Sequence, residues 1–128
     1  MNRLKAKIKT IKNIGKLHFL SFIIKKQNIS MLSLEINENI KIGDIVYLTI
    51  KSTNIALSKK LPQNISIINK LETKIIDIKD GEILTSIKLD IDGFILESII
   101  TTQSYLDMNL NIDDEVIALI KGSEIAIC

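Results

Sequence analysis

The sequence predicts an all-β protein built from two small tandem barrels, and three observations support this prediction. Hydrophobic residues make up 46% of the 128 residues and are dominated by isoleucine and leucine, a bias that we take to favour strands. The chain carries an internal repeat, and each copy holds about five short apolar runs separated by turn signals. A chain of this length can bury a core as one domain or as two very small domains that pack against each other.

The repeat is visible in the ordered pairing of identical residues. An offset of 67 pairs Asn2 with Asn69, and an offset of 70 later in the copies pairs Lys51 with Lys121. The second copy therefore contains three extra residues, which we place around the turn "DIDG" at residues 90–93. Duplication of one ancestral unit is the expected cause of such a pattern.

The strands are clearest in the second copy, where apolar runs rich in isoleucine lie between the turn signals "KDGE", "DIDG" and "NIDD". Several of these runs alternate apolar and polar residues, as half-buried strands do. We predict strands in this copy at residues 71–78, 83–90, 94–100, 115–120 and 124–127.

The alternation fails in "TTQSYLDMNL" at residues 101–110, which instead predicts a short helix before the fourth strand. Thr101 or Thr102 can cap this helix, and Leu106 and Leu110 fall on one face of it. The first copy has "SMLSLEINENI" at the same place. Five strands with one short helix before the fourth resemble an OB-like barrel.

The predicted fold class is therefore all-β, with two tandem OB-like five-stranded barrels that each carry one short helix. The first unit is expected at residues 1–60 and the second at residues 65–128. The first unit is the more degenerate of the two.

The net charge of +2 conceals a strong asymmetry between the halves of the chain. Residues 1–64 carry 12 Lys or Arg against 3 Asp or Glu, whereas residues 65–128 carry 5 against 12. The basic half could bind nucleic acid, or basic and acidic surfaces could face each other within the chain or between chains. We favour the second interpretation because it explains both signs.

Several functional classes are poorly supported by the composition. Lysines interrupt the N-terminal apolar residues at close intervals, so we predict neither a signal peptide nor a membrane span and expect a cytoplasmic protein. The single cysteine, Cys128, cannot form a disulfide or a metal cluster within the chain, and with a single histidine, His18, zinc chemistry and a Ser-His-Asp triad are poorly supported. Because no carboxylate pair suggests acid–base work, we predict that the protein is not an enzyme.

Two related interruptions in apolar runs are the main candidates for chemistry. "IALIKGSEIAI" at residues 117–127 and "YLTIKSTNIAL" at residues 47–57 match at the offset of 70. We name the interruptions the KGS turn (Lys121, Gly122, Ser123) and the KST turn (Lys51, Ser52, Thr53). A turn with an ammonium, a hydroxyl and exposed backbone N–H groups can receive an anion, although a solvated hairpin turn has the same composition.

Two further groups of polar residues are candidates for the same chemistry. Thr101 and Ser104 carry hydroxyls at the start of the predicted helix, where unpaired N–H groups favour an anion, and simple capping is the alternative. Ser66, with Asn69, precedes the first strand of the second copy, where a plain loop is the alternative.

The second copy resembles the molybdate-binding Mop or TOBE domain family. Its residues "NKLETKI…SIITTQSYLDMNLNIDDEVIALIKGSEIAI" are similar to the family's N-x-L-x-G-x-I start, I-T-x-x-S helix cap and A-x-I-K-A-S-x-V end. Two such copies resemble a di-Mop molbindin, and also the C-terminal ligand-sensing part of the ModE regulators. The first copy is the weaker match.

The resemblance implies a homo-oligomer, a dimer, trimer or hexamer, that binds molybdate or tungstate at interfaces between units and uses no organic cofactor. Position by position, Thr101 and Ser104 match the hydroxyls of I-T-x-x-S, the KGS turn matches K-A-S, and Ser66 matches the serine of S-A-R-N. The metal would then be held only as an oxyanion. Little in the sequence separates molybdate from tungstate.

The sequence departs from the family pattern at several of these positions. The arginine of S-A-R-N is replaced by Ile68 in the second copy and by Met1 in the first, and Arg3 is the nearest substitute. Met31 and Leu34 take the places of Thr101 and Ser104 in the first copy. We therefore expect the KGS turn to act together with Thr101 and Ser104, and the KST turn to face Met31 and Leu34 and to bind less.

Three functions from different classes follow from these observations. The first is storage, buffering or homeostasis of molybdate or tungstate in the cytoplasm. The second is a ligand-sensing regulatory module that lacks its own DNA-binding domain and acts through a partner. The third is a nucleic-acid-binding barrel, which is disfavoured because the only clustered aromatic residues are Phe19 and Phe22.

Overall fold

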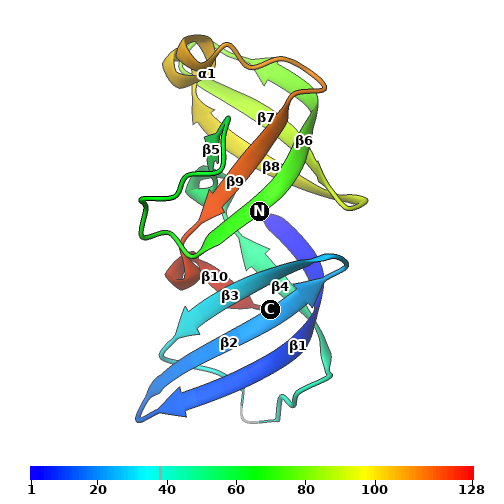
Figure 1. The fold of residues 1–128 in the computed structure, drawn as a ribbon, viewed down its shortest axis with the longest axis vertical. Coiled ribbons are helices and arrows are strands. Elements are labelled where there is room, and N and C mark those ends of the chain that lie inside the picture. Colours follow the sequence, from blue (N-terminus) through cyan, green and yellow to red (C-terminus); the bar gives the residue numbers. More distant parts are fainter. Residues whose placement is uncertain (38) are drawn as a thin grey trace.

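Two curled five-stranded sheets form the molecule, one above the other along its long axis (Figure 1). The computed structural model describes residues 1–37 and 39–128. Within these residues the strands and helices are, in chain order, β1 (Asn2–Ile14), β2 (Leu17–Ile24), β3 (Gln27–Ser33), β4 (Ile45–Ile50), the 3-10 turn η1 (Ser52–Asn54), β5 (Ala56–Ser58), β6 (Asn69–Asp80), β7 (Leu84–Ile91), β8 (Phe94–Thr101), α1 (Thr102–Met108), β9 (Glu115–Ile120), the 3-10 turn η2 (Gly122–Glu124) and β10 (Ile125–Ile127). The prediction of an all-β fold with two tandem five-stranded units is confirmed.

The last short strand of each copy adds to the sheet of the other copy. The sheet orders are β10-β4-β1-β2-β3 and β5-β9-β6-β7-β8, with every neighbouring pair antiparallel. Ile125 of β10 pairs with Ile50 of β4, and Ala56 of β5 pairs with Leu119 of β9. The division at residues 1–60 and 65–128 stays a prediction, because β5 and β10 cross between the sheets.

The two copies share the same hairpin geometry. The β2–β3 and β7–β8 hairpins turn at Lys25 and Asp92, whose φ values of 53° and 51° are left-handed. Leu20 pairs with Met31 just as Ile87 pairs with Ser98. The offset of 67 therefore holds through β3 and β8, and the placement of the three extra residues at the "DIDG" turn is wrong: they lie after β8, where α1 is found.

Helix α1 is present only in the second copy among the described residues. Its N-cap is Thr101, whose hydroxyl accepts from the backbone N–H of Ser104 at 3.1 Å. At the offset of 67, Leu34 stands where Thr101 would be and has no oxygen for a cap. No helix forms in residues 34–37 or 39–44, so the prediction of one helix in each unit holds for the second unit alone.

The face that α1 turns toward the core differs from the predicted one. Leu110 is buried, but it lies beyond the end of the helix, and Leu106 is 62% exposed. Tyr105 and Met108 pack against the core instead. Successive residues of a helix are rotated by about 100°, so a pattern read one residue out points to a different side of the helix.

One hydrophobic core runs through both sheets. It joins Leu4 and Phe22 of the first sheet to Leu71 and Ile87 of the second, and Ile125 of the exchanged strand β10 belongs to the same cluster. Alternate residues of β1 and β6 are buried, which is the period of a half-buried strand. None of the helices in residues 1–37 and 39–128 combines the length and the apolar character needed to cross a membrane.

The exchanged strand should contribute strongly to stability. Ile125 is 3% exposed and belongs to the core that joins the two sheets. We expect Ile125→Ala to lower the free energy of unfolding by about 2–5 kcal/mol, the usual cost for a buried isoleucine. Urea unfolding followed by circular dichroism measures this change. The control is Ile112→Ala at a 53% exposed position, and equal losses in the two variants would contradict the role of the exchanged strand.

Candidate oxyanion site

The KGS turn lies against the first sheet, not against its own. It follows β9, and Glu124 donates its backbone N–H to the carbonyl of Lys121 at 3.0 Å. A Cβ at Gly122 would stand 3.3 Å from the carbonyl oxygen of Ser30 and 3.5 Å from the backbone nitrogen of Leu32, both in β3. Glycine therefore allows the backbone of the turn to approach β3 closely.

A pocket of about 300 Å³ opens beside this turn. Four of the predicted site residues line it together: Ser66, Lys121, Gly122 and Ser123. The other lining residues are apolar side chains: Phe19, Leu32 and Ile68. No described lining residue carries a carboxylate, and the carboxylate of the adjacent Glu124 accepts from Asn54 Nδ2 at 2.9 Å. An ammonium and hydroxyl donors with no competing negative charge suit an anion.

The KST turn occupies the corresponding place against the second sheet. Ser52 is 6% exposed and donates its hydroxyl to Oε1 of Glu97 in β8 at 3.0 Å. Lys51 and Thr53 are exposed. Ser98 of β8 also donates to the carbonyl of Ile55, which follows the turn, at 2.6 Å.

Each turn therefore faces the other copy, so the KGS turn is not paired with the helix cap within one chain, and the pairing stays a prediction for contacts between chains. Ser123 shares an open hollow of about 590 Å³ with Leu34, the residue equivalent to Thr101. The KST turn, not the KGS turn, packs on β8, which ends at Thr101. The physical reason is the crossing of the chain at each turn, which sends β5 and β10 to the opposite sheet.

Thr101 and Ser104 form a self-contained cap at the end of α1. Besides accepting from the Ser104 N–H, Thr101 donates its hydroxyl to Ser104 Oγ at 2.9 Å. Both residues are exposed, and neither lines the pocket beside the KGS turn. The cap end of α1 lies at one end of the molecule, whereas the KGS turn before β10 lies midway along it (Figure 1).

Two buried asparagines hold the copies together in the same way. Asn69 accepts from the backbone N–H of Ser30 at 2.7 Å and donates to its carbonyl at 2.8 Å. Asn2 makes the same two bonds, at 2.7 and 2.8 Å, to the backbone of Glu97. In the sequence Asn2 matches Asn69, and Asn69 is with Ser66 a candidate for anion binding, but the sequence does not predict that the two asparagines join the copies.

Arg3, the expected substitute for the family arginine, lies away from the pocket beside the KGS turn. The Arg3 guanidinium stacks on the Tyr47 ring, 4.2 Å from its centroid, and does not line the pocket. Ile68, at the arginine's own place, contributes an apolar wall to the pocket. Lys121 is consequently the single cation among the described lining residues.

Glu97 is the residue near a candidate turn that sequence reasoning missed. Ser86 donates its hydroxyl to Oε2 at 2.7 Å, and Ser52 donates to Oε1. These hydrogen bonds, first that of Ser86 and then that of Ser52, lower the pKa of the Glu97 carboxyl against the opposing effect of burial. The positive charges of the N-terminal ammonium and Lys88 act in the same direction as the hydrogen bonds.

The lowered pKa has a defined consequence for stability. The ionised form is favoured by folding, so its contribution is present above the pKa of the unfolded chain and is lost as the pH falls through the folded pKa. We expect the Glu97 carboxyl carbon to titrate by NMR with a midpoint below the ordinary range of glutamate. Glu97→Gln should remove this part of the acid sensitivity, which lies below the ordinary glutamate pKa of about 4.3. A midpoint at or above the ordinary value would show that the serine bonds are not maintained in solution.

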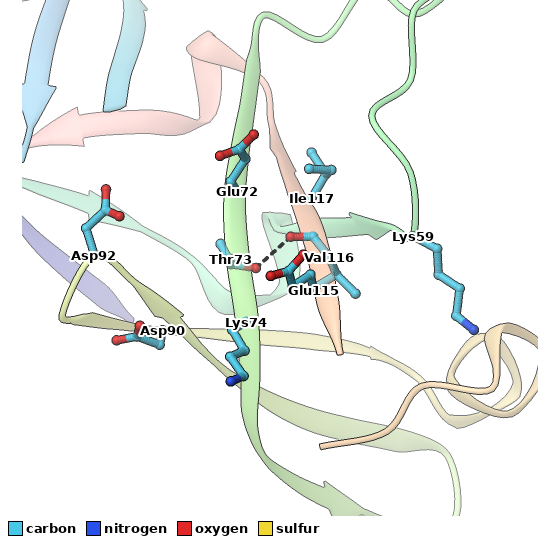
Figure 2. Close-up of a pocket in the computed structure, with 9 residues that line it drawn as sticks. All are labelled: Lys59, Glu72, Thr73, Lys74, Asp90, Asp92, Glu115, Val116 and Ile117. Atoms are coloured by element: carbon cyan, nitrogen blue, oxygen red, sulfur yellow. Dashed lines mark hydrogen bonds between the residues drawn. The ribbon is translucent and has the colours of Figure 1, made fainter. Parts of the chain in front are cut away.

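A larger cleft, of about 460 Å³, lies on the second sheet and is less suited to an oxyanion (Figure 2). Thr73 of β6 donates to the carbonyl of Val116 at 2.9 Å at its centre. Lys59 and Lys74 are outnumbered there by four carboxylates, those of Glu72, Asp90, Asp92 and Glu115. A dianion would meet net repulsion in this cleft.

Ion pairs within residues 1–37 and 39–128 do not neutralise the charge asymmetry of the sequence. Within the described ranges the one ion pair joins Lys74 to Asp113, at 3.8 Å, and both side chains are well exposed. Arg3, Lys5 and Lys7 project from the exposed face of β1. Within the described residues, ion pairs therefore give no support to the interpretation that basic and acidic surfaces meet within one chain.

The single histidine and the single cysteine lie apart from the pocket. His18 Nδ1 is 2.6 Å from Asn13 Oδ1, between β1 and β2. Cys128 is exposed. In residues 1–37 and 39–128 no three His, Cys, Asp or Glu side chains gather to hold a metal ion.

Comparisons with known proteins agree with this architecture. Residues 65–127 match the TOBE domain. A crystal structure of the cytoplasmic molybdate-binding protein ModG, with molybdate bound, superposes with a TM-score of 0.89 and 17% identity, covering 98% of this chain and 94% of that one. A search of curated protein sequences found no match.

Two shorter proteins match about half of the chain. A molybdate-binding protein from Sporomusa ovata is 37% identical over 46% of this chain and 88% of its own, with a TM-score of 0.45. MopII from Clostridium pasteurianum is 29% identical over 45% of this chain and 88% of its own, with a TM-score of 0.43. Residues 65–127 therefore belong to the TOBE domain family, and the whole chain has the tandem fold of the ModG structure.

Proposed function

We propose that this protein binds molybdate or tungstate as a tetrahedral oxyanion in the pocket beside the KGS turn. Lys121 supplies the positive charge, Ser123 and Ser66 supply hydroxyl donors, and Gly122 lets the turn that carries Lys121 and Ser123 pack closely on β3. The observation that carries the proposal is that these four residues, chosen from sequence, line one pocket that holds no carboxylate among its described residues.

The donor set matches the chemistry of the ligand. Molybdate and tungstate are unprotonated dianions at neutral pH, so they accept hydrogen bonds and donate none. Phosphate usually carries a proton and would need an acceptor, which Lys121 does not supply and which a serine hydroxyl supplies only by turning its oxygen, not its hydrogen, toward the ligand. Sulfate would have to be rejected by size alone. The molybdate-bound ModG structure, which shares this tandem fold, adds support from a related architecture.

The proposed role is storage, buffering or homeostasis of the oxyanion in the cytoplasm, without an organic cofactor and without a catalytic step. Thr101 and Ser104, which do not line the pocket within one chain, would join a site only through a neighbouring copy of a homo-oligomer. Leu17, Leu32 and Leu34 are 41%, 37% and 70% exposed beside Ser123. This apolar surface next to the KGS turn supports an interface at that position.

Isothermal titration calorimetry of the purified protein tests the proposal. Molybdate and tungstate should bind at micromolar concentrations, sulfate should bind much more weakly, and phosphate should not bind. Light scattering on the same samples measures the size of the oligomer. Absence of heat with both metal oxyanions would reject the proposal.

A further inference from the structure

The two turns have the same frame but different side chains where an anion would sit. Asn2 fixes the backbone of Glu97 with the same two hydrogen bonds by which Asn69 fixes the backbone of Ser30. The KST turn packs on β8 beside Glu97, and the KGS turn packs on β3 beside Ser30. Glu97 and Ser30 are thus equivalent positions at the two turns.

At the KST turn a carboxylate of the chain already occupies the donor groups. Oε1 of Glu97 accepts from Ser52 at 3.0 Å and Oε2 accepts from Ser86 at 2.7 Å, so both carboxylate oxygens are engaged. Asn2 Nδ2 lies 3.4 Å from the Ser52 hydroxyl and extends the same network. At the KGS turn the equivalents of Ser52 and Ser86 are Gly122 and Phe19, and no carboxylate lines the pocket there.

We propose that the KST turn is a second oxyanion position, and that the Glu97 carboxylate occupies it as a resident anion that excludes molybdate, tungstate or sulfate. The hydroxyls of Ser52 and Ser86 are the donors that a tetrahedral oxyanion would use there. Lys51 begins this turn as Lys121 begins the other. The inference rests on the proposed function for its ligand class and assigns the difference between the two turns to one side chain.

Exclusion has two physical causes. A hydroxyl has one hydrogen to donate, and Ser52 and Ser86 each give theirs to Glu97. An ionised carboxylate in the same place also repels a dianion, and the partly buried position screens this repulsion less than bulk water would. The hydrogen bonds that fix the backbone of residue 97 come from Asn2 and do not use the carboxylate, so replacing the side chain leaves the frame intact.

The test is to remove the resident anion and count the bound ligand. Glu97→Ser, which places at position 97 the residue found at position 30, should bind about one more molybdate per chain than the native protein in calorimetry. The gain should persist with Lys121→Ala and Ser123→Ala in the same chain, and should vanish with Ser52→Ala. Glu97→Ala, with circular dichroism to verify folding, serves as a second variant without a new hydroxyl.

The reciprocal variant is Ser30→Glu, which installs a carboxylate at the KGS turn and should abolish molybdate binding there. The failure of this inference is separable from that of the proposed function. If the native chain binds no oxyanion but Glu97→Ser binds one that Ser52→Ala removes, the resident-anion inference stands and the proposed site at the KGS turn fails. If folded Glu97→Ser and Glu97→Ala bind no more than the native chain, the inference is overturned.

Discussion

The double variant Lys121→Ala, Ser123→Ala should bind molybdate at least about 100-fold more weakly than the native protein. Each substitution removes a donor to a charged acceptor, and such a hydrogen bond contributes about 1.5–3 kcal/mol. Two of them together correspond to about two orders of magnitude in Kd. Calorimetry under the conditions used for the native chain measures the loss.

The matched control uses the equivalent residues of the other turn. Lys51→Ala, Thr53→Ala makes the same chemical changes at the KST turn, where both side chains are exposed and Ser52 is engaged by Glu97. This control should retain native affinity within about twofold, which is less than 0.5 kcal/mol. Equal losses in the two double variants would place the ligand outside the pocket beside the KGS turn.

Asn69→Ala should be among the most destabilising substitutions of a polar residue in this chain. Asn69 is 2% exposed, and its side chain pairs with both the N–H and the carbonyl of Ser30 in the other sheet. Removing it leaves two partly buried backbone groups without partners, each costing about 1–3 kcal/mol. We expect the free energy of unfolding to fall by about 2–4 kcal/mol in urea denaturation.

Symmetry supplies a second variant and position 28 supplies a control. Asn2→Ala should cost a similar amount, because Asn2 makes the equivalent bonds to Glu97. Asn28→Ala, at an exposed site on β3, should change stability by less than about 0.5 kcal/mol. A cost for Asn69→Ala no larger than that for Asn28→Ala would show that the asparagine bonds do not hold the two copies together.

Local pattern was sufficient to predict the strands and the turns. The alternation along "LETKIIDI" matches the burial of alternate residues in β6, and the turn signals match the observed hairpins. The exchange of β5 and β10 could not be predicted, because either sheet can accept a three-residue apolar strand with equal local propensity. Which sheet accepts it is decided by the direction of the chain after each turn.

The crossing of β5 and β10 to the opposite sheets also explains why the site was predicted only in part. Ser66, Lys121, Gly122 and Ser123 were chosen from residue types, and they line one pocket. Their expected partnership with Thr101 and Ser104 is not formed within one chain, because each turn packs on the sheet of the other copy. Glu97 was not predicted as a site residue, because a single glutamate in the strand "FILESII" resembles an ordinary exposed residue. Nothing in that stretch indicates that Ser52 and Ser86, from other elements, donate to its carboxylate.

Two differences in sequence explain why no helix forms in the described residues between β3 and β4 of the first copy. Leu34 has no hydroxyl for the cap that Thr101 provides, and the first copy is three residues shorter in this connection. Both facts were present in the sequence, but placing the extra residues at the hairpin turn concealed the second. The two hairpin turns have the same length, with a left-handed residue at the same place in each, Lys25 and Asp92, so the three extra residues do not lie there.

A crystal structure of the protein grown with tungstate tests the central claim most directly, because tungsten gives a strong anomalous signal. The expected peak lies in the pocket beside the KGS turn, with tungstate oxygens about 3 Å from Lys121 Nζ and Ser123 Oγ. In the native protein no peak should appear where Glu97 meets Ser52 and Ser86. Tungstate bound only elsewhere, with the KGS pocket empty, would contradict the assignment.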